Sequence, residues 1–200
     1  MRLLVASRNP KKLAELARIL DAAQVHGVEL VGLGEVPPYD EAPETAPDFE
    51  GNALAKAQDG AAATGMACVA DDSGITVDAL NGMPGVLSAR WSGDHGEDAA
   101  NTALLLAQCA DVPDERRGAA FVSAAALVVP GVGEHVVLGR WPGRLARAPS
   151  GDGGFGYDPV FLPDGETGSA ADMSAEAKDA ASHRGRALAQ LVPVLRELTR

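Results

Sequence analysis

The sequence is poor in aromatic residues and cysteine, and its basic residues are too few to balance its acidic ones. Aromatic side chains make up 4% of the 200 residues, so the core must be built from small aliphatic side chains. The two cysteines, Cys68 and Cys109, have a spacing that fits neither a disulfide framework nor a CxxC metal site. We therefore expect two buried thiols in a protein of a reducing compartment.

Positive charge is in deficit over the whole chain. Lys and Arg number 17 against 28 Asp and Glu, which gives a net charge of −11. A surface field of this sign repels polyanions, so binding of nucleic acid is not expected. A phosphate-bearing ligand would need a local group of cations or a bound metal ion.

Long apolar runs are also missing. No stretch reaches the roughly 18 residues that a membrane span needs, so we expect no membrane partner. The opening residues 1–6 are too short for a secretory signal and lead directly into a polar segment. These absences predict a cytoplasmic protein.

The order of apolar and polar segments predicts an α/β fold of one domain over residues 1–200, a mixed β-sheet flanked by helices. Strands are expected at residues 3–6, 29–33, 66–70, 119–129 and 135–141. Helices are expected after Pro10, at 52–63 and 98–109, and over 174–198 with interruptions at Gly185 and Pro193. Loops are expected at 34–48 and 150–156, the second rich in glycine.

The first candidate site lies between the first strand and the first helix. Asn9 is a good N-cap, Pro10 suits the first helical position, and the stripe of Leu13, Leu16, Ala17 and Leu20 follows. Free backbone N–H groups at such a helix start attract anions. The candidate residues are Ser7, Arg8, Asn9, Pro10, Lys11 and Lys12. The alternative is that the two lysines are simply solvated.

Carboxylates form the second candidate site. Asp71 and Asp72 directly follow the strand expected at 66–70, and their mutual repulsion would be relieved by a divalent cation. Oxygen ligands favour Mg²⁺ over Zn²⁺. In the alternative, one Asp caps a turn and the other is solvated. Lys56, on the helix expected at 52–63, could reach a phosphate or belong to a plain surface helix.

The glycine-rich loop matches G-x-G-x-x-G at residues 151–156, but its surroundings argue against a dinucleotide-binding fold. It does not follow the first strand and leads into extended chain rather than a helix. We expect Phe155 and Tyr157 to approach a flat ligand and Asp158 to accept hydrogen bonds from a base edge. Core packing of Phe155 is the alternative. Lys178, Ser182 and His183 form a cationic group that can share a helix face.

In this order, the segments resemble the inosine-triphosphate pyrophosphatase family, whose bacterial members are XTP/dITP diphosphatases. The resemblance spans the chain: Ser7, Asn9 and Lys12; Glu44, Thr45, Phe49, Asn52 and Lys56; residues 70–74, 84–85, 88–90, 141–143 and 153–159; and residues 182–185. Arg8, Ala46 and Gly51 depart from the residues common at those positions.

The resemblance implies a two-lobed homodimer with a substrate cleft between the lobes. It implies Mg²⁺-dependent hydrolysis of ITP, dITP and XTP to the monophosphate and pyrophosphate. The loop from Ser7 to Lys12 and Lys56 would hold the triphosphate, and Asp72 with Glu44 would bind Mg²⁺, aided by Asp71. Asp72 would also be the proton acceptor.

The remaining implied positions contact the nucleoside. Ser73 would lie on the substrate, and the base and sugar would be lined by Phe155, Gly156, Tyr157, Asp158, Lys178, His183 and Arg184. Hydrogen-bond donors near His183 and Arg184 would select the 6-oxygen of the purine. Two other functions stay open from the sequence: a Maf-like pyrophosphatase of different base preference, and a nucleotide-binding module without catalysis.

Overall fold

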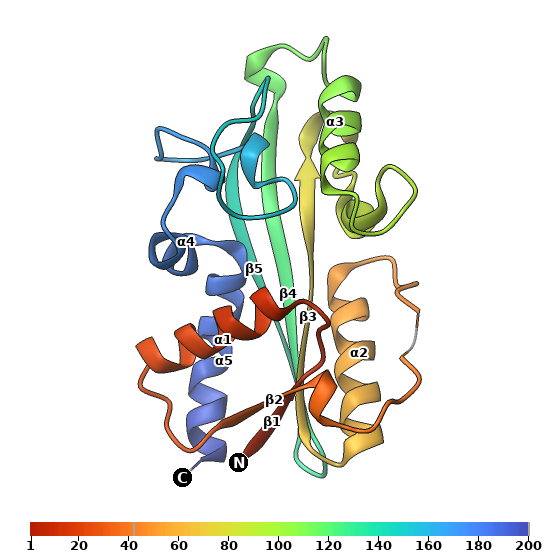
Figure 1. The fold of residues 1–200 in the computed structure, drawn as a ribbon, viewed down its shortest axis with the longest axis vertical. Helices are drawn as coiled ribbons and strands as arrows, with labels where there is room; N and C mark the ends of the chain where they lie inside the picture. Colours follow the sequence, from red (N-terminus) through yellow and green to blue (C-terminus); the bar gives the residue numbers. More distant parts are fainter. Residues whose placement is uncertain (42, 200) are drawn as a thin grey trace. The chain divides into compact units, whose positions relative to one another are not determined.

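The computed structural model describes residues 1–41 and 43–199, and within them six strands form one sheet in the order β2-β1-β3-β4-β5-β6. β1 is parallel to β2 and β3, and β5 is antiparallel to β6, so the sheet is mixed (Figure 1). The strands are β1 Arg2–Val5, β2 Glu29–Gly32, β3 Ala67–Val77, β4 Gly118–Val129, β5 Gly133–Leu145 and β6 Phe161–Pro163.

Five α-helices accompany the described strands. They are α1 Pro10–Ala22, α2 Phe49–Thr64, α3 Asp98–Gln108, α4 Ala175–Ala181 and α5 His183–Leu198. The predicted α/β class, with a mixed sheet and flanking helices, is confirmed. None of the helices in the described part of the chain is long and apolar enough to cross a bilayer.

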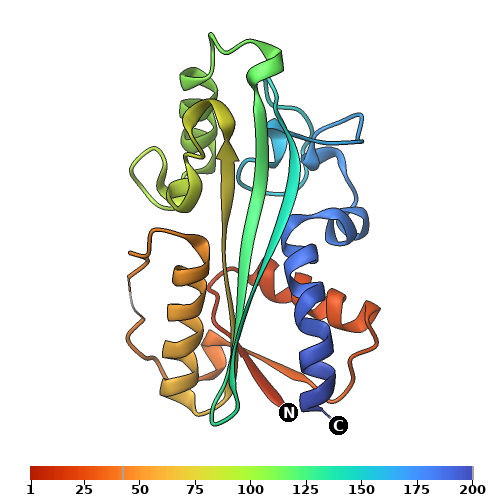
Figure 2. The ribbon, with the colours of Figure 1, turned by 180° about the vertical axis from the view of Figure 1, so that it is seen from behind.

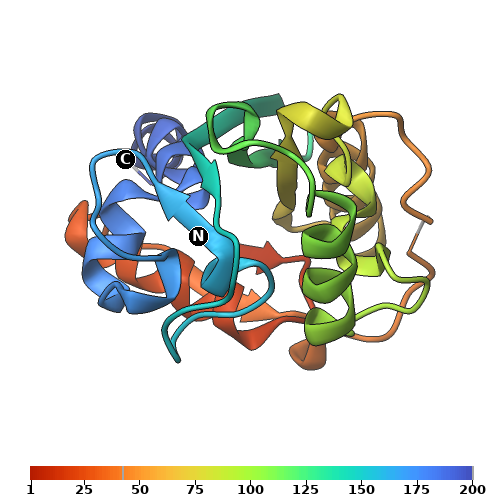
Figure 3. The ribbon, with the colours of Figure 1, turned by 90° about the horizontal axis from the view of Figure 1, so that it is seen from above.

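The chain divides into two compact units. Unit 1 comprises Met1–Asp72, Ser123–Gly139 and Arg184–Arg200, and unit 2 comprises Ser73–Val122 and Arg140–His183. Unit 1 contains β1, β2, α1, α2 and nearly all of α5. Unit 2 contains α3, β6 and α4 (Figure 3).

In unit 1, alternate residues of the central strands face different helices. Leu3 and Val69 pack in the cluster that includes Leu16 of α1 and Leu191 of α5. Leu4 and Cys68 instead lie against Gly60 of α2. α2 therefore covers one face of these strands, and α1 and α5 cover the other (Figures 1 and 2).

The start of α1 matches the expectation from the sequence. Asn9 caps the helix by accepting a hydrogen bond from the Lys11 N–H, and Pro10 occupies the first helical position. The predicted stripe is wrong at one residue, because Ala17 is exposed while Glu15 is buried. An ion pair between Glu15 and Arg184 explains how a carboxylate occupies that buried position.

β3 is longer than predicted. The expected strand ended at Ala70 in a polar turn, whereas β3 continues through Asp71 and Asp72 to Val77. Both carboxylates have cationic partners, so the strand can remain buried through them. The two aspartates consequently lie within a strand and not in a loop.

Two helix boundaries also differ from the expectation. α2 begins at Phe49 because Asp48 caps it by accepting from the Gly51 N–H. The C-terminal helices separate at Ser182, whose backbone is extended, and not at Gly185. Pro193 lies inside α5 without ending it.

Unit 2 has its own apolar core. It joins Leu105 of α3, Phe121 of β4, Trp141 of β5 and Phe161 of β6. The Phe121 ring lies 4.6 Å from the Phe161 ring and 4.8 Å from the imidazole of His183, between ring centroids. The few aromatic residues of the chain are thus concentrated in this unit.

Gly60 is a packing requirement of unit 1. A methyl group at Gly60 would lie 2.6 Å from Cys68 Sγ and 3.0 Å from Leu4 Cδ2. We expect Gly60→Ala to lower the melting temperature by about 3–6 °C, because overpacking of about 1–3 kcal/mol outweighs the helix preference for alanine. Thermal unfolding followed by circular dichroism tests this. Gly34→Ala, with open space at the methyl position, is the control and should melt like the unaltered protein.

Candidate active site

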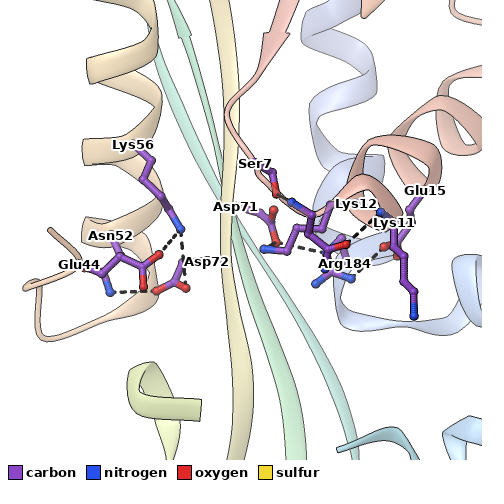
Figure 4. A network of polar contacts seen from close by, with 11 residues as sticks. Ser7, Lys11, Lys12, Glu15, Glu44, Asn52, Lys56, Asp71, Asp72 and Arg184 are labelled. Carbon is purple, nitrogen blue, oxygen red and sulfur yellow. Dashed lines mark hydrogen bonds and ion pairs between the residues drawn. The ribbon is translucent and has the colours of Figure 1, made fainter. Parts of the chain in front are cut away.

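Asp71 and Asp72 point to opposite faces of β3, which is the feature that organises the site (Figure 4). Asp71 is on the side of α1 and α5, and Asp72 is on the side of α2, as the alternation of the strand requires. The predicted repulsion between adjacent carboxylates, relieved by one shared cation, is therefore wrong as a physical reason for a metal site. Each carboxylate has cationic partners of its own.

On the first face, Asp71 is surrounded by cations. Its Oδ2 lies 2.8 Å from Lys12 Nζ and 3.2 Å from Arg184 Nε. Burial alone would raise the pKa of Asp71, but the charges of Lys12 and Arg184 outweigh burial and hold the pKa well below its usual range. Burial lowers the pKa of Lys12, with Asp71 opposing that effect.

Arg184 is bound to carboxylates of unit 1. Its Nη1 donates to Glu15 Oε2 at 2.8 Å, in addition to the contact of its Nε with Asp71. The guanidinium thus shares the Asp71 oxygen with Lys12, and the base contact that the resemblance implies for Arg184 stays a prediction. Glu15 is a site residue that sequence reasoning missed. Its position three residues after Lys12, on the same face of the predicted helix, is the feature of the sequence that could have indicated it.

On the second face, Asp72 lies with an amide, a lysine and a second carboxylate. Asn52 Nδ2 donates to Asp72 Oδ2 at 2.9 Å, and Lys56 Nζ is 3.9 Å from Asp72 Oδ1. Lys56 also donates to Glu44 Oε1 at 2.7 Å. Burial raises the pKa of Asp72, and Lys56 and Asn52 offset that rise only in part.

On the face of Asp72, Glu44 and Asp72 are the carboxylates that could share a divalent cation. Within residues 1–41 and 43–199, no group of three or more His, Cys, Asp or Glu side chains is arranged to hold a metal. However, Mg²⁺ typically uses only one or two protein carboxylates when phosphates and water complete its shell. The ammonium of Lys56, held between Glu44 and Asp72, shows that this position attracts a cation.

The loop from Ser7 to Lys12 contains side chains with different surroundings. Ser7 Oγ accepts from the Asn9 N–H at 3.2 Å, which helps to shape the turn. Lys12 reaches Asp71, while Lys11 is exposed and extends away from Asp71 in Figure 4. Arg8 is exposed and donates to Glu41 Oε1 at 2.8 Å. The structure thus brings Lys12 to the buried carboxylate of Asp71, while Lys11 extends away from it.

Unit 2 contains the residues predicted to meet the base. Asp158 Oδ2 accepts from the Phe155 N–H at 2.7 Å and also from Lys178 Nζ. The Lys178 ammonium lies 4.9 Å from the centre of the half-buried Phe155 ring. Phe155 is only half-buried, whereas Phe121, Trp141 and Phe161 of the same unit are buried. In the structure the Asp158 carboxylate fixes the glycine-rich loop.

Tyr157 and His183, two residues predicted to contact the nucleoside, are buried in unit 2. The Tyr157 side chain belongs to the core of unit 2, and its hydroxyl donates to the Ser88 carbonyl at 2.8 Å. The His183 ring stacks on Phe121 with an interplanar angle of 13°. Lys178 and His183 lie in separate helices, so the predicted shared helix face is wrong.

Comparison with known proteins gives the family. A profile of the Ham1 family matches residues 3–194. The chain belongs to the Ham1 family. Among curated Ham1 relatives, a dITP/XTP pyrophosphatase of Nocardia farcinica is 73% identical, over 98% of this chain and 96% of that protein. The resemblance deduced from the motifs is therefore confirmed.

Solved structures of Ham1 relatives have the same fold. A dITP/XTP pyrophosphatase of Mycobacterium abscessus superposes with a TM-score of 0.80 at 67% identity, covering 98% of this chain and 100% of that one. A HAM1 protein of Coxiella burnetii superposes with a TM-score of 0.88 at 37% identity, covering 98% and 99%. The mixed sheet with flanking helices is thus shared over nearly the whole chain.

The charge of Lys56 lowers the pKa of Asp72, so removing that charge should shift this pKa in a direction that can be measured. We expect Lys56→Met to raise the pKa of Asp72 further, because a nearby positive charge favours the ionised carboxylate. A ¹³C NMR titration of the Asp72 carboxyl group measures the change. Arg2→Gln, which removes an exposed cation paired with Glu29, should leave the Asp72 titration unchanged. An unaltered Asp72 titration in Lys56→Met would contradict the assigned coupling.

Proposed function

We propose that this Ham1-family protein is a pyrophosphatase of non-canonical purine nucleoside triphosphates. It hydrolyses ITP, dITP and XTP to the nucleoside monophosphate and pyrophosphate. The observation that carries the proposal is the pair of buried carboxylates on β3, each paired with a lysine, in a chain 73% identical to a dITP/XTP pyrophosphatase. Cations placed beside carboxylates suit a substrate of high negative charge, because phosphoryl chemistry depends mainly on positioning and charge neutralisation.

Unit 1 would bind the triphosphate. Lys12 and Lys56 supply positive charge, and the start of α1 adds backbone N–H groups and the positive end of the helix dipole. On binding, phosphate oxygens would replace Glu44 as the partner of the Lys56 ammonium. Glu44 and Asp72 would then hold Mg²⁺, which when bound neutralises charge on the phosphate oxygens.

Asp72 would act as the proton acceptor. Its raised pKa makes it a better base than an exposed aspartate, and the Asn52 amide fixes one of its two oxygens. The other oxygen, Oδ1, which lies 3.9 Å from Lys56 Nζ, would accept the proton of a water molecule. The oxygen of that water would form a bond to the α-phosphorus as the bond from this phosphorus to the departing pyrophosphate breaks. The proton removed from the water would reside on the Asp72 carboxylate.

Unit 2 would bind the base. The half-buried Phe155 ring offers a flat surface, and Lys178 beside it is a cationic donor suited to the 6-oxygen of hypoxanthine or xanthine. Adenine has an amino group at that position and would leave the donor unpaired. We further propose that the protein is cytoplasmic and works as a homodimer. Sedimentation at working concentration would test the oligomeric state.

Product analysis is the direct test of this function. We expect the purified protein with ITP and Mg²⁺ to yield IMP and pyrophosphate, with dITP and XTP also cleaved and ATP, dTTP and dUTP cleaved far more slowly. EDTA should abolish turnover, and added Mg²⁺ should restore it. Preference for dTTP or dUTP would favour a Maf-like activity, and binding without turnover would contradict catalysis.

The role of Asp72 is tested by Asp72→Asn, which keeps the size of the side chain and removes the base. We expect kcat to fall by about 10² to 10⁴-fold, the usual worth of general-base catalysis. Asp21→Asn, at an exposed position of α1, is the control and should keep full activity. Retention of more than a few per cent of the activity by Asp72→Asn would refute its role as proton acceptor.

A further inference from the structure

Glu15 is a buried carboxylate that lies outside the motifs of the predicted site. It is 6% exposed on α1, one helical turn after Lys12. Charged side chains are almost never buried this deeply unless they are paired. Since Glu15 shares α1 with Lys12, a lysine of the proposed phosphate site, its pairing bears on that site.

The partner of Glu15 connects it to Lys12 through two further charges. Glu15 Oε2 accepts from Arg184 Nη1 at 2.8 Å, and Arg184 Nε donates to Asp71 Oδ2 at 3.2 Å. The same Asp71 oxygen lies 2.8 Å from Lys12 Nζ. Figure 4 shows this chain of contacts on the α1 and α5 side of β3. Three elements of unit 1 are thus joined by alternating charges.

Glu15 and Lys12 each pair with a residue of another element, although helix geometry would let them pair with each other. Lys12 and Glu15 are three residues apart, a spacing at which they could pair directly on the surface of α1. Instead, Glu15 contacts Arg184 of α5 and Lys12 contacts Asp71 of β3. Lys12 is thereby directed at β3, beside the carboxylates of the site.

Charge balance makes Glu15 necessary to this arrangement. Two cations and two carboxylates form a neutral set, and the side chain of Arg184 is 4% exposed. Arg184 also lies in the first turn of α5, where the helix dipole disfavours a cation. Without the Glu15 carboxylate, Arg184 would lose the acceptor of its Nη1 and would compete more strongly with Lys12 for the shared Asp71 oxygen.

We propose that Glu15 is a positioning residue for the triphosphate. Acting through Arg184 and Asp71, it holds the Lys12 ammonium where it can bind phosphate. The proposal rests on the proposed function, since it concerns the same phosphate site. Because Glu15 acts through Arg184 and Asp71, its effect is on binding of the phosphates and not on the chemical step.

The experiment compares Glu15→Gln and Glu15→Asp with Glu29→Gln. Glu29 is an exposed partner of Arg2, so its variant is a matched loss of one carboxylate from an ion pair. We expect KM for ITP to rise about tenfold in Glu15→Gln, since displacing a binding group can cost up to about 100-fold. The value of kcat should stay within about twofold, and Glu15→Asp should fall between Glu15→Gln and the unaltered protein.

A binding measurement without turnover separates positioning from folding. By calorimetry without metal, we expect inorganic tripolyphosphate to bind Glu15→Gln about tenfold more weakly, and inosine to bind it as it binds the unaltered protein. If the unaltered protein fails to cleave ITP, the proposed function is refuted. The tripolyphosphate measurement still tests the role of Glu15 in that case, because it needs no turnover.

The outcomes that overturn the proposal are distinct. Unchanged KM and unchanged tripolyphosphate affinity in Glu15→Gln would show that Lys12 does not depend on Glu15. A fall in kcat with unchanged KM would place its effect on the chemical step. Equal weakening of tripolyphosphate and inosine, or failure of Glu15→Asp to fold, would assign Glu15 to general stability.

Discussion

The structure of the site depends on the alternation of side chains along β3. Two consecutive buried aspartates would repel one another strongly on one surface, but the pleat of a strand sends them to opposite faces. Each then meets a lysine from a different helix, Lys12 from α1 or Lys56 from α2. One strand can therefore place two carboxylates of opposite pKa behaviour next to each other in sequence.

The different surroundings of the two carboxylates give them different capacities. Asp71 has two cations within hydrogen-bond distance and a lowered pKa, so it stays ionised and serves as an anchor. Asp72 has a more distant lysine and a raised pKa, so it is suited to accept a proton or to share a metal with Glu44. Buried charges are expensive unless paired, and the lysines that pair them are the same groups that a triphosphate would recruit.

Much of the fold could be predicted because its signals are local. Asn9 and Pro10 mark the start of α1, and the apolar runs of β1 and β4 are typical of buried strands. The extension of β3 through Asp71 could not be seen in the sequence, because it depends on cations supplied by α1 and α5. Likewise, the burial of Glu15 in place of Ala17 depends on Arg184, a residue 169 positions away. Long-range ion pairs overrode local polarity at both places.

The assignment of different roles to Asp71 and Asp72 is tested most directly by steady-state kinetics of Asp71→Asn and Asp72→Asn with ITP and Mg²⁺. We expect Asp71→Asn to raise KM while most of kcat remains, and Asp72→Asn to lose kcat with KM little changed. Equal losses of kcat in both variants, with no difference in KM, would contradict separate roles for the two faces of β3.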